Sequence, residues 1–251
     1  MASRGEKLES KGNSSVEVVI PVYNEETDLP RCIRVLHSFL KEHLTDRPWR
    51  ILVADNGSTD ATLQIAAKLS REYPEMAFVH IPVKGRGRAL KQAFLQSQAD
   101  ILSYMDVDLA TGLEAFPRLL QALEEGYDIA IGSRYLAGSR IRRTFGRRLY
   151  SWGYNLLFRA LFRSRVQDAQ CGFKAMKAEV AREVLPKVQD PGWSFDTELL
   201  IRAEKKGYRI KEVPVEWHED LESKVRIPGT ILRMLRVLLK LRWELWWGAR
   251  A

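Results

Sequence analysis

The stretch "ILSYMDVDLA", residues 101–110, runs from an apolar sequence typical of a buried strand directly into two aspartates. Only Val107 separates Asp106 from Asp108, so two carboxylates that repel each other stand close together where the strand ends. One explanation is local, because acidic residues often form the turn that closes a strand. The other is chemical, because two carboxylates at one strand end can hold a divalent cation such as Mg²⁺ or Mn²⁺. The pair by itself leaves both explanations open.

Short apolar runs and amphipathic helical stretches alternate through the first half of the chain. Strands are predicted at residues 16–23, 50–55, 76–82, 100–108 and 127–134. Helices are predicted between them, at residues 29–44, 58–73, 87–99 and 113–126. Strands that alternate with helices predict an α/β fold, here an α/β/α sandwich with a mostly parallel central sheet.

Polar side chains gather after the predicted strands. In an open parallel sheet the carboxyl ends of the strands meet at one edge, where ligands bind. The residues at these ends are Tyr23, Asn24 and Glu25; Asp55 and Asn56; Lys84 to Arg88; Asp106 and Asp108; Ser133 and Arg134. Each group alone is compatible with turn formation, but together they predict one binding crevice.

Three of these groups allow a binding role and a structural alternative. Asp55 could accept hydrogen bonds from a base or ribose, or form an Asx turn within "DNGSTD". The run "KGRGRAL" combines flexible glycines with cations, which suits a phosphate neighbourhood, although it matches neither the P-loop nor the dinucleotide fingerprint. Arg134 could present its forked guanidinium to a phosphate, or pair with a nearby carboxylate.

The composition is that of one sizeable globular domain with a basic surface. The chain has 251 residues and a formal net charge of +8, which indicates anionic partners such as phosphates, an acidic membrane surface or nucleic acid. Its two cysteines, Cys32 and Cys171, lie far apart and predict neither a disulfide framework nor a cysteine-built metal site. Residues 1–15 are polar, lack the apolar core of a signal peptide, and are expected to form a flexible tail. No run predicts a membrane-spanning helix.

Two segments of the second half combine basic residues with aromatic and aliphatic ones. Residues 140–165 contain many arginines and no acidic residue. Residues 227–251 repeat the combination at helical spacing and end in tryptophans, which favour the depth of lipid headgroups. Both segments predict amphipathic helices at a membrane interface. The alternatives are contact with RNA and a solvated basic face over an ordinary core.

Five motifs, "VVIPVYNEE", "VADNGSTDAT", "GRGRAL", "DVDLA" and "IGSR", occur in an order that resembles the family 2 inverting glycosyltransferases. The resemblance implies the GT-A fold, a Rossmann-like α/β/α sandwich that binds a nucleotide sugar. In the second half, "DAQCGFKAM" (168–176), "WSFDTELLIRAEKKGYRIKEVPVEW" (193–217) and "ESKVR" (222–226) resemble polyprenyl-phosphate and dolichyl-phosphate glycosyltransferases, above all the dolichyl-phosphate β-glucosyltransferases. The chain is therefore expected to be a glycosyltransferase.

The expected domain organisation follows the same division of the chain. We expect a GT-A domain at residues 16–226, with a nucleotide-binding half at 16–134 and an acceptor half at 135–226. An amphipathic membrane-interface helix is expected to follow at residues 227–251.

The resemblance implies roles for the residues that match its motifs. Those implied to hold the nucleotide sugar are Pro21, Tyr23, Asn24, Glu25, Asp55, Gly57, Lys84, Gly85, Arg88 and Val107. Those implied to be catalytic are Asp106, Asp108, Arg134 and Asp196, of which Asp106 and Asp108 would hold Mg²⁺ or Mn²⁺ and the diphosphate. Those implied to meet the acceptor or its phosphate are Arg134, Gln170, Ser223, Lys224 and Arg226. Asp168, Gln170, Asp196 and Glu198 are implied to line the sugar side.

The expected reaction is the transfer of a hexose to a dolichyl or polyprenyl phosphate with inversion. Mannosyl members of the family often carry a polar residue where this chain has Ala110, which favours UDP-glucose over GDP-mannose as the donor. A lipid monophosphate is largely dianionic, because its second pKa is about 6, and needs no general base. A sugar hydroxyl does need one. Asp196 is then a ligand of the sugar or, for a hydroxyl acceptor, the base.

Other functions are compatible with the same sequence. They are mannosyl transfer from GDP-mannose, transfer to a hydroxyl acceptor and, remotely, a non-catalytic module that binds RNA or a nucleotide. The favoured interpretation is an enzyme bound peripherally to the cytoplasmic face of a membrane, without a nucleic-acid partner.

Overall fold

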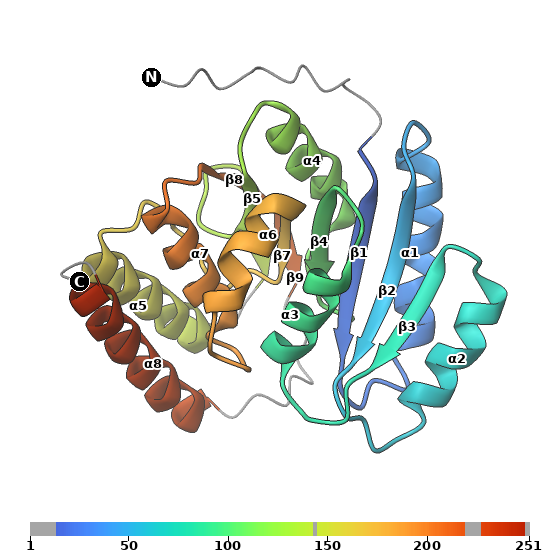
Figure 1. The fold of residues 1–251 in the computed structure, drawn as a ribbon, viewed down its shortest axis with the longest axis horizontal. Coiled ribbons are helices and arrows are strands. Elements are labelled where there is room, and N and C mark those ends of the chain that lie inside the picture. Colours follow the sequence, from blue (N-terminus) through green and yellow to red (C-terminus); the bar gives the residue numbers. More distant parts are fainter. Residues whose placement is uncertain (1–13, 143–144, 219–226, 249–251) are drawn as a thin grey trace.

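The computed structural model of the chain describes residues 14–142, 145–218 and 227–248, which form an α/β/α sandwich with two long helices at one end (Figure 1). Its centre is a seven-stranded sheet in the order β3-β2-β1-β4-β7-β5-β8. The strands of this sheet are β1 (Val16–Val22), β2 (Trp49–Asp55), β3 (Met76–His80), β4 (Ile101–Met105), β5 (Ile129–Ser133), β7 (Phe173–Lys177) and β8 (Ile210–Pro214). Two short parallel strands, β6 (Arg140–Arg142) and β9 (Glu216–His218), form a second sheet.

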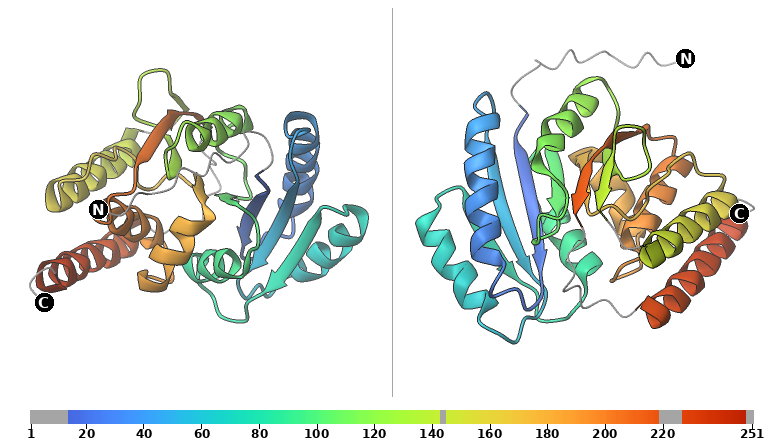
Figure 2. Two further views of the ribbon diagram at one scale, coloured as in Figure 1. Left: turned by 45° about the horizontal axis from the view of Figure 1, so that its top comes forward. Right: turned by 180° about the vertical axis from the view of Figure 1, so that it is seen from behind.

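Helices cover both faces of the large sheet (Figure 2). The α-helices of the described residues are α1 (Leu29–His43), α2 (Thr62–Glu72), α3 (Arg86–Gln96), α4 (Phe116–Glu124), α5 (Phe145–Phe162), α6 (Ala178–Val184), α7 (Phe195–Lys205) and α8 (Ile227–Gly248). Short 3₁₀ turns lie at Leu113–Ala115 and Leu185–Lys187. The five strands and four helices predicted from the first half are confirmed, with ends that differ by a few residues.

Alternation along β1 divides the core into two layers. Val18 and Ile20 belong to a hydrophobic cluster with residues of α1, α2 and α4, whereas Val19 belongs to one with residues of α3, α6 and α7. Successive side chains of a strand point to opposite faces of the sheet. All of β1 is buried, as expected for a central parallel strand that is covered on both sides.

One strand departs from the parallel pattern, and this departure shapes the site. β7 lies between β4 and β5 and runs antiparallel to both. In the register of β4 and β7, Met105 lies opposite Phe173. The next residues along the two chains, Asp106 and Gly172, therefore meet at the carboxyl end of β4.

The small sheet fixes the segment that follows Asp108. The backbone N–H of Gly112 donates to the carbonyl of Glu216, and the N–H of His218 donates to the carbonyl of Ala110. The end of the "DVDLA" motif is thus tied to β9, a strand that lies far away in sequence.

Helices α5 and α8 lie side by side at one end of the molecule (Figures 1 and 2). Phe158 of α5 and Leu238 of α8 are buried, so both helices pack on the domain through one side. Among the described residues, none of the helices has the length and low charge that a membrane span requires.

The predicted N-terminal tail lies almost wholly outside the described residues. Ser15, its last residue, is placed: its hydroxyl donates a 2.8 Å hydrogen bond to the carboxylate of Asp100. The hydrogen bond joins the residue just before β1 to the residue just before β4.

Candidate active site

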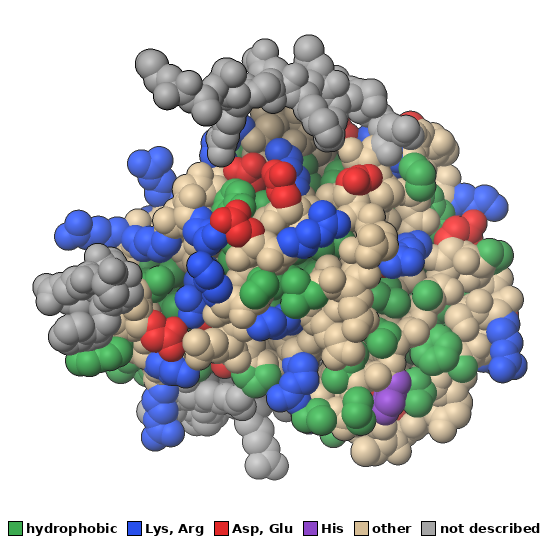
Figure 3. All heavy atoms as spheres, in the orientation of Figure 1, with side chains coloured by type: hydrophobic (Ala, Val, Ile, Leu, Met, Phe, Trp, Pro, Cys, Tyr) green, Lys and Arg blue, Asp and Glu red, His purple; other side chains and the backbone are tan. Residues whose placement is uncertain are grey.

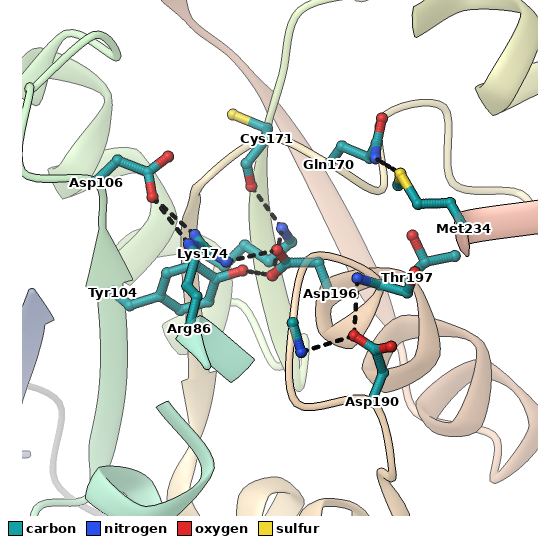
Figure 4. Close-up of polar contacts among 12 residues, drawn as sticks. Arg86, Tyr104, Asp106, Gln170, Cys171, Lys174, Asp190, Asp196, Thr197 and Met234 are labelled. Atoms are coloured by element: carbon teal, nitrogen blue, oxygen red, sulfur yellow. Dashed lines mark hydrogen bonds and ion pairs between the residues drawn. The ribbon is translucent and has the colours of Figure 1, made fainter. Parts of the chain in front are cut away.

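Asp106 lies at the carboxyl end of β4 and faces Arg86 (Figure 4). Its Oδ1 accepts a hydrogen bond of 2.8 Å from Nη2 of Arg86 and one of 3.2 Å from Nε. Arg86 is the first residue of α3, so the fold brings the "KGRGRAL" run to the aspartate pair. The side chain of Asp106 is 43% exposed, whereas that of Arg86 is 11% exposed. The carboxylate is therefore accessible to solvent, while its guanidinium partner is mostly buried.

Gly172 packs directly against the carboxylate of Asp106. A Cβ atom on Gly172 would lie 1.9 Å from Oδ2 and 2.6 Å from Cγ of Asp106. No side chain fits there unless the aspartate moves. The glycine in "DAQCGFKAM" thus allows β7 to begin where β4 ends, and its backbone supports the carboxylate on one side.

Asp108 takes part in the turn that follows β4. Its Oδ1 accepts a 2.9 Å hydrogen bond from the backbone N–H of Ala110, and Leu109 has a left-handed φ of 51°. The structure therefore contains the turn that was one of the two explanations for this residue. A carboxylate has acceptor capacity beyond one such bond, so turn formation is compatible with metal binding.

The aspartate pair fits a cation that is shared with a phosphate-bearing substrate. In the part of the chain that the structure describes, no group of three or more His, Cys, Asp or Glu side chains could hold a metal ion. Mg²⁺ is usually bound by one or two carboxylates together with substrate phosphates. Asp106, supported on Gly172, offers the hard oxygen donors that such an ion prefers.

Asp196 is the buried partner of the same arginine. It lies in the first turn of α7, where the helix N-terminus favours a negative charge. Its carboxylate accepts a 2.9 Å hydrogen bond from Nη1 of Arg86 and lies 3.2 Å from Nζ of Lys174. The hydroxyl of Tyr104 donates to it as well. One guanidinium therefore bridges the exposed Asp106 and the buried Asp196.

Burial shifts the protonation of this network. Burial raises the pKa of Asp196 to about 6, although the nearby Arg86 opposes the shift. Burial also lowers the pKa of Lys174 to about 7. Lys174 is fully buried in β7, and its ammonium also donates to the carbonyl of Cys171. A lysine ammonium so far from water needs these acceptors, which makes Lys174 a fixed support for Asp196.

Arg134 lies in a second buried ion pair. Its Nε and Nη2 donate to the two carboxylate oxygens of Asp168 at 2.7 and 2.9 Å, and its guanidinium lies 5.5 Å from the ring centre of Trp217. Burial alone would raise the pKa of Asp168, but the charge and hydrogen bonds of Arg134 lower it. Of the two alternatives for Arg134, the structure therefore contains the pairing with a carboxylate. Its contact with a phosphate stays a prediction.

Asp55 is fully buried at the end of β2 and has two partners. Its Oδ2 lies 2.6 Å from Nδ1 of His80, and its Oδ1 accepts a 3.2 Å hydrogen bond from the N–H of Ser58. The second bond is the Asx-type turn considered from the sequence. His80 is 39% exposed, so it links the buried carboxylate to the surface.

The loops after β1, β2 and β3 are joined to one another. Nζ of Lys84 lies 3.5 Å from the ring centre of Tyr23. The N–H of Gly85 donates to the side chain of Asn56, and Asn24 accepts a hydrogen bond from the N–H of Thr59. The polar groups predicted to share a crevice at these three strand ends are thus brought together.

The glycines of "KGRGRAL" serve close packing. A Cβ on Gly87 would lie 2.5 Å from Cβ of Phe195, and one on Gly85 would lie 2.7 Å from the carbonyl oxygen of Pro191. The first turn of α3 therefore packs tightly on the start of α7. The sequence suggested flexible glycines, whereas the structure uses them to bring Arg86 close to Asp196.

Two other predicted residues, Glu198 and Gln170, make their hydrogen bonds away from Asp106. Glu198 faces the loop before α7, where it accepts hydrogen bonds from the N–H groups of Gln189 and Asp190. The side-chain amide of Gln170 donates to Sδ of Met234 in α8 at 3.7 Å. The predicted acceptor residues outside the described part of the chain are Ser223, Lys224 and Arg226.

The remaining predicted residues lie in β1 or in the segments that follow β1, β2, β3 and β4. Val107 is buried between the two aspartates, and Pro21 is buried in β1. The N–H of Glu25 donates to the hydroxyl of Thr62, and the N–H of Arg88 donates to the carbonyl of Pro191. Gly57 has a left-handed φ of 84° in the loop after β2.

Sequence reasoning missed four residues of the site, Tyr104, Gly172, Lys174 and His80. It included Arg86 only within the run Lys84 to Arg88, without a role of its own. Only one of the four carried a clear signal. Lys174 stands inside a mostly apolar strand, "FKAMK", so its charged side chain must find partners inside the protein. The others depend on which strands are neighbours, and the antiparallel insertion of β7 was not predicted.

Residues 17–185 match the family Glycosyl transferase family 2. The chain belongs to this family. It is a glycosyltransferase with the GT-A fold, as the motifs predicted. Two of its most similar solved structures, each less than 25% identical, support the fold alone. The first is glucosyl-3-phosphoglycerate synthase from Mycobacterium tuberculosis in complex with Mn²⁺, UDP-glucose and phosphoglyceric acid (22% identity, TM-score 0.66, covering 91% of this chain and 80% of that one). The second is the mannosyltransferase PcManGT from Pyrobaculum calidifontis in complex with GDP-Man and Mn²⁺ (19% identity, TM-score 0.57, covering 87% of this chain and 60% of that one).

Curated relatives cover nearly the whole chain. It is 36% identical over 232 residues to glycosyltransferase AglD of Haloferax volcanii. The matched segment covers 92% of this chain and 37% of that protein. It is 30% identical over 247 residues to the dolichyl-phosphate beta-glucosyltransferase of Saccharomyces cerevisiae, a match that covers 90% of this chain and 74% of that protein. It is 33% identical over 234 residues to the dolichol-phosphate mannosyltransferase of Pyrococcus furiosus, a match that covers 91% of this chain and 64% of that protein. The chain thus spans little more than a third of the Haloferax relative.

Replacing Asp196 by Asn should change how stability depends on pH. Because burial raises the pKa of Asp196 from 3.8 to about 6, the folded protein binds the proton more tightly than the unfolded chain. The free energy of unfolding of the wild type should therefore fall, relative to Asp196→Asn, by about 2 kcal/mol between pH 4 and pH 6.5 and level off above about pH 7. Urea unfolding of both proteins across this range measures the difference. A wild type that gains stability relative to the variant as pH rises would mean that Arg86 and Lys174 outweigh burial.

Replacing Gly172 by Ala should displace Asp106, because the new Cβ needs the space of its carboxylate. We expect sugar transfer to fall by about 100-fold, the cost of a misplacement of about 1 Å, while the circular dichroism spectrum stays that of a folded protein. Gly153→Ala is the control for stability, since nothing lies within 4 Å of its Cβ position, and its melting temperature should not fall. Full activity of Gly172→Ala would contradict the role given to Asp106.

Proposed function

We propose that this glycosyltransferase moves glucose from UDP-glucose to a dolichyl or polyprenyl phosphate, with inversion at the anomeric carbon. The arrangement around Asp106 carries this proposal: an accessible carboxylate at a strand end, backed by glycine, beside a bridging arginine and a buried acid. The name of the yeast relative, dolichyl-phosphate beta-glucosyltransferase, supports the choice of donor sugar and acceptor.

Asp106 and Asp108 are the residues that would hold Mg²⁺ or Mn²⁺. A divalent ion bound there supplies positive charge to the leaving diphosphate. The two structural neighbours were solved with Mn²⁺ beside UDP-glucose and GDP-Man respectively, which supports the same use of metal here. The chain's own part is to fix the Asp106 carboxylate, which lies directly against Gly172.

The nucleoside would bind over the loops after β1, β2 and β3. His80, fixed by Asp55 at 2.6 Å, and Tyr23, under the ammonium of Lys84, offer polar and aromatic surface for a base and ribose. The cation of Lys84 also suits the neighbourhood of a phosphate.

A phosphate acceptor agrees with the surroundings of Asp196. This carboxylate is only 4% exposed and already has Arg86, Lys174 and Tyr104 as partners. A general base must reach the proton that it removes, and a carboxylate so enclosed is poorly placed for that. A dianionic phosphate needs no base, so we assign Asp196 to the positioning of Arg86.

The end of the molecule formed by α5 and α8 would lie on the membrane surface. Trp152 and Leu156 on α5 and Leu239 and Trp243 on α8 are each at least 50% exposed. Each pair is one helical turn apart, so its two side chains share one face. Lys and Arg side chains gather over this half of the face drawn in Figure 3. Apolar anchors among cations suit a surface of acidic lipid, which would bring the lipid phosphate to the enzyme.

A mannosyl donor is the second candidate. The Pyrococcus relative, named dolichol-phosphate mannosyltransferase, is as similar as the glucosyltransferases. Ala110 favours glucose, but its backbone rather than its side chain makes the contacts described, with His218 and Asp108. The assay below therefore compares both donors.

Transfer of labelled sugar into the organic-extractable fraction tests this function. With polyprenyl phosphate and Mg²⁺, we expect label from UDP-glucose and little from GDP-mannose, and a chelator should abolish it. Asp108→Asn is the matched variant that should lose the activity. Label from GDP-mannose would overturn the donor assignment alone, whereas an absence of lipid-linked label from both donors would exclude the acceptor.

Vesicle sedimentation tests the membrane surface. The double variant Trp152→Ser/Trp243→Ser should bind vesicles that contain acidic lipid about tenfold or more weakly, because two large apolar side chains no longer enter the interface. Phe78→Ser is the control, since Phe78 on β3 is also exposed but lies at the far edge of the sheet. Equal loss of binding in both variants would show that general exposure, and not this surface, determines vesicle binding.

A further inference from the structure

Arg86 donates to one of the two carboxylate oxygens of Asp106, the residue that would hold a cation. Both Nη2 and Nε of Arg86 donate to Oδ1 of Asp106, and the other oxygen, Oδ2, lies against Gly172. In this state the most favourable electrostatic partner of Asp106 is a guanidinium of the protein itself.

Arg86 keeps a second partner when Asp106 is engaged elsewhere. Its Nη1 donates to Asp196 at 2.9 Å, and Asp196 is itself held by Lys174 and Tyr104. The guanidinium also lies 5.2 Å from the ring centre of Tyr104 and 5.5 Å from that of Trp193. The arginine can therefore leave Asp106 without becoming an unpaired buried charge.

A neighbouring positive charge weakens the affinity of a carboxylate for any cation. Like charges a few ångströms apart repel each other, and the repulsion is stronger in a partly buried site than in bulk water. The same repulsion acts on a divalent cation that approaches Asp106. A diphosphate changes this balance, because its oxygens can bind the cation and a guanidinium at once.

We propose that Arg86 is an internal counter-ion that competes with the divalent cation for Asp106, so that the cation binds well only together with the diphosphate of the donor. This inference rests on the proposed function, in which Asp106 and Asp108 hold the metal. The competition favours joint binding of the donor and the metal, and it disfavours binding of the metal without the donor.

A purely structural role for Arg86 makes the opposite prediction. If Arg86 only held Asp106 in its orientation, its removal would weaken metal binding with or without nucleotide. If it competes, its removal strengthens metal binding in the absence of nucleotide. The sign of the change separates the two roles without any measurement of sugar transfer.

The test is a titration with Mn²⁺, in which free Mn²⁺ is measured by electron paramagnetic resonance, with and without UDP. The wild type should bind Mn²⁺ weakly alone and much more tightly with UDP. Arg86→Met should bind Mn²⁺ alone about tenfold or more tightly than the wild type, so the advantage that UDP confers shrinks. Equal or weaker binding of Mn²⁺ alone by Arg86→Met overturns the proposal.

Two further variants keep the test decisive. Arg86→Met leaves Asp196 buried without its arginine, so the double variant Arg86→Met/Asp196→Asn removes both charges, and it too should bind Mn²⁺ alone more tightly. Lys91→Met is the control for net charge, because Lys91 lies on α3 but donates to the carbonyls of Pro186 and Val188 rather than to a carboxylate. Its affinity for Mn²⁺ should match that of the wild type, and an increase equal to that of Arg86→Met would overturn the proposal.

Asp108→Asn separates this inference from the proposed function. In the presence of UDP it should bind Mn²⁺ far more weakly than the wild type. If it binds as tightly, the metal lies elsewhere, and both the metal site and the competition are wrong. If it loses Mn²⁺ while Arg86→Met gains none, the metal site stands and only the competition fails.

Discussion

The bridge that Arg86 makes between Asp106 and Asp196 is the interaction on which the site depends. It joins the first turn of α3, the end of β4 and the first turn of α7 through three side chains. Buried or half-buried charges of opposite sign stabilise each other only when their hydrogen bonds are complete. The network meets this condition because Lys174 and Tyr104 provide the remaining partners of Asp196. Loss of one member would leave the others as uncompensated charges.

Strand topology makes this bridge possible. Since β7 runs antiparallel between β4 and β5, its first residues lie beside the last residues of β4. Gly172 therefore meets Asp106, and two residues later Lys174 reaches Asp196 from β7. A parallel strand in the same place would begin at the opposite end of the sheet and could supply neither residue. The reversed strand β7 therefore places Gly172 and Lys174 beside the residues of this charge network.

Much of the fold could be read from the sequence, because the first half follows regular patterns. Apolar strands and amphipathic helices alternate from Val16 to Ser133, as predicted. The loops after β1, β2 and β3 are joined to one another, whereas Arg134 lies in a separate ion pair with Asp168. The site was predicted only in part. Asp106, Asp108 and Asp196 were given roles, whereas Arg86 appeared only within the run Lys84 to Arg88. Its role depends on the contact of Gly87 with Phe195, which joins segments more than a hundred residues apart. The pairing of Arg134 with Asp168 was foreseen only as an alternative, since sequence cannot show which carboxylate lies nearest.

The most direct test of this account is a crystal structure of the protein with Mn²⁺ and UDP-glucose, with the metal located by its anomalous scattering. The account predicts Mn²⁺ bound to Asp106 and Asp108 beside the diphosphate, with Arg86 withdrawn from Asp106 and still paired with Asp196. Mn²⁺ located away from these two aspartates, or bound to them while Arg86 keeps its present contacts with Asp106, would contradict it.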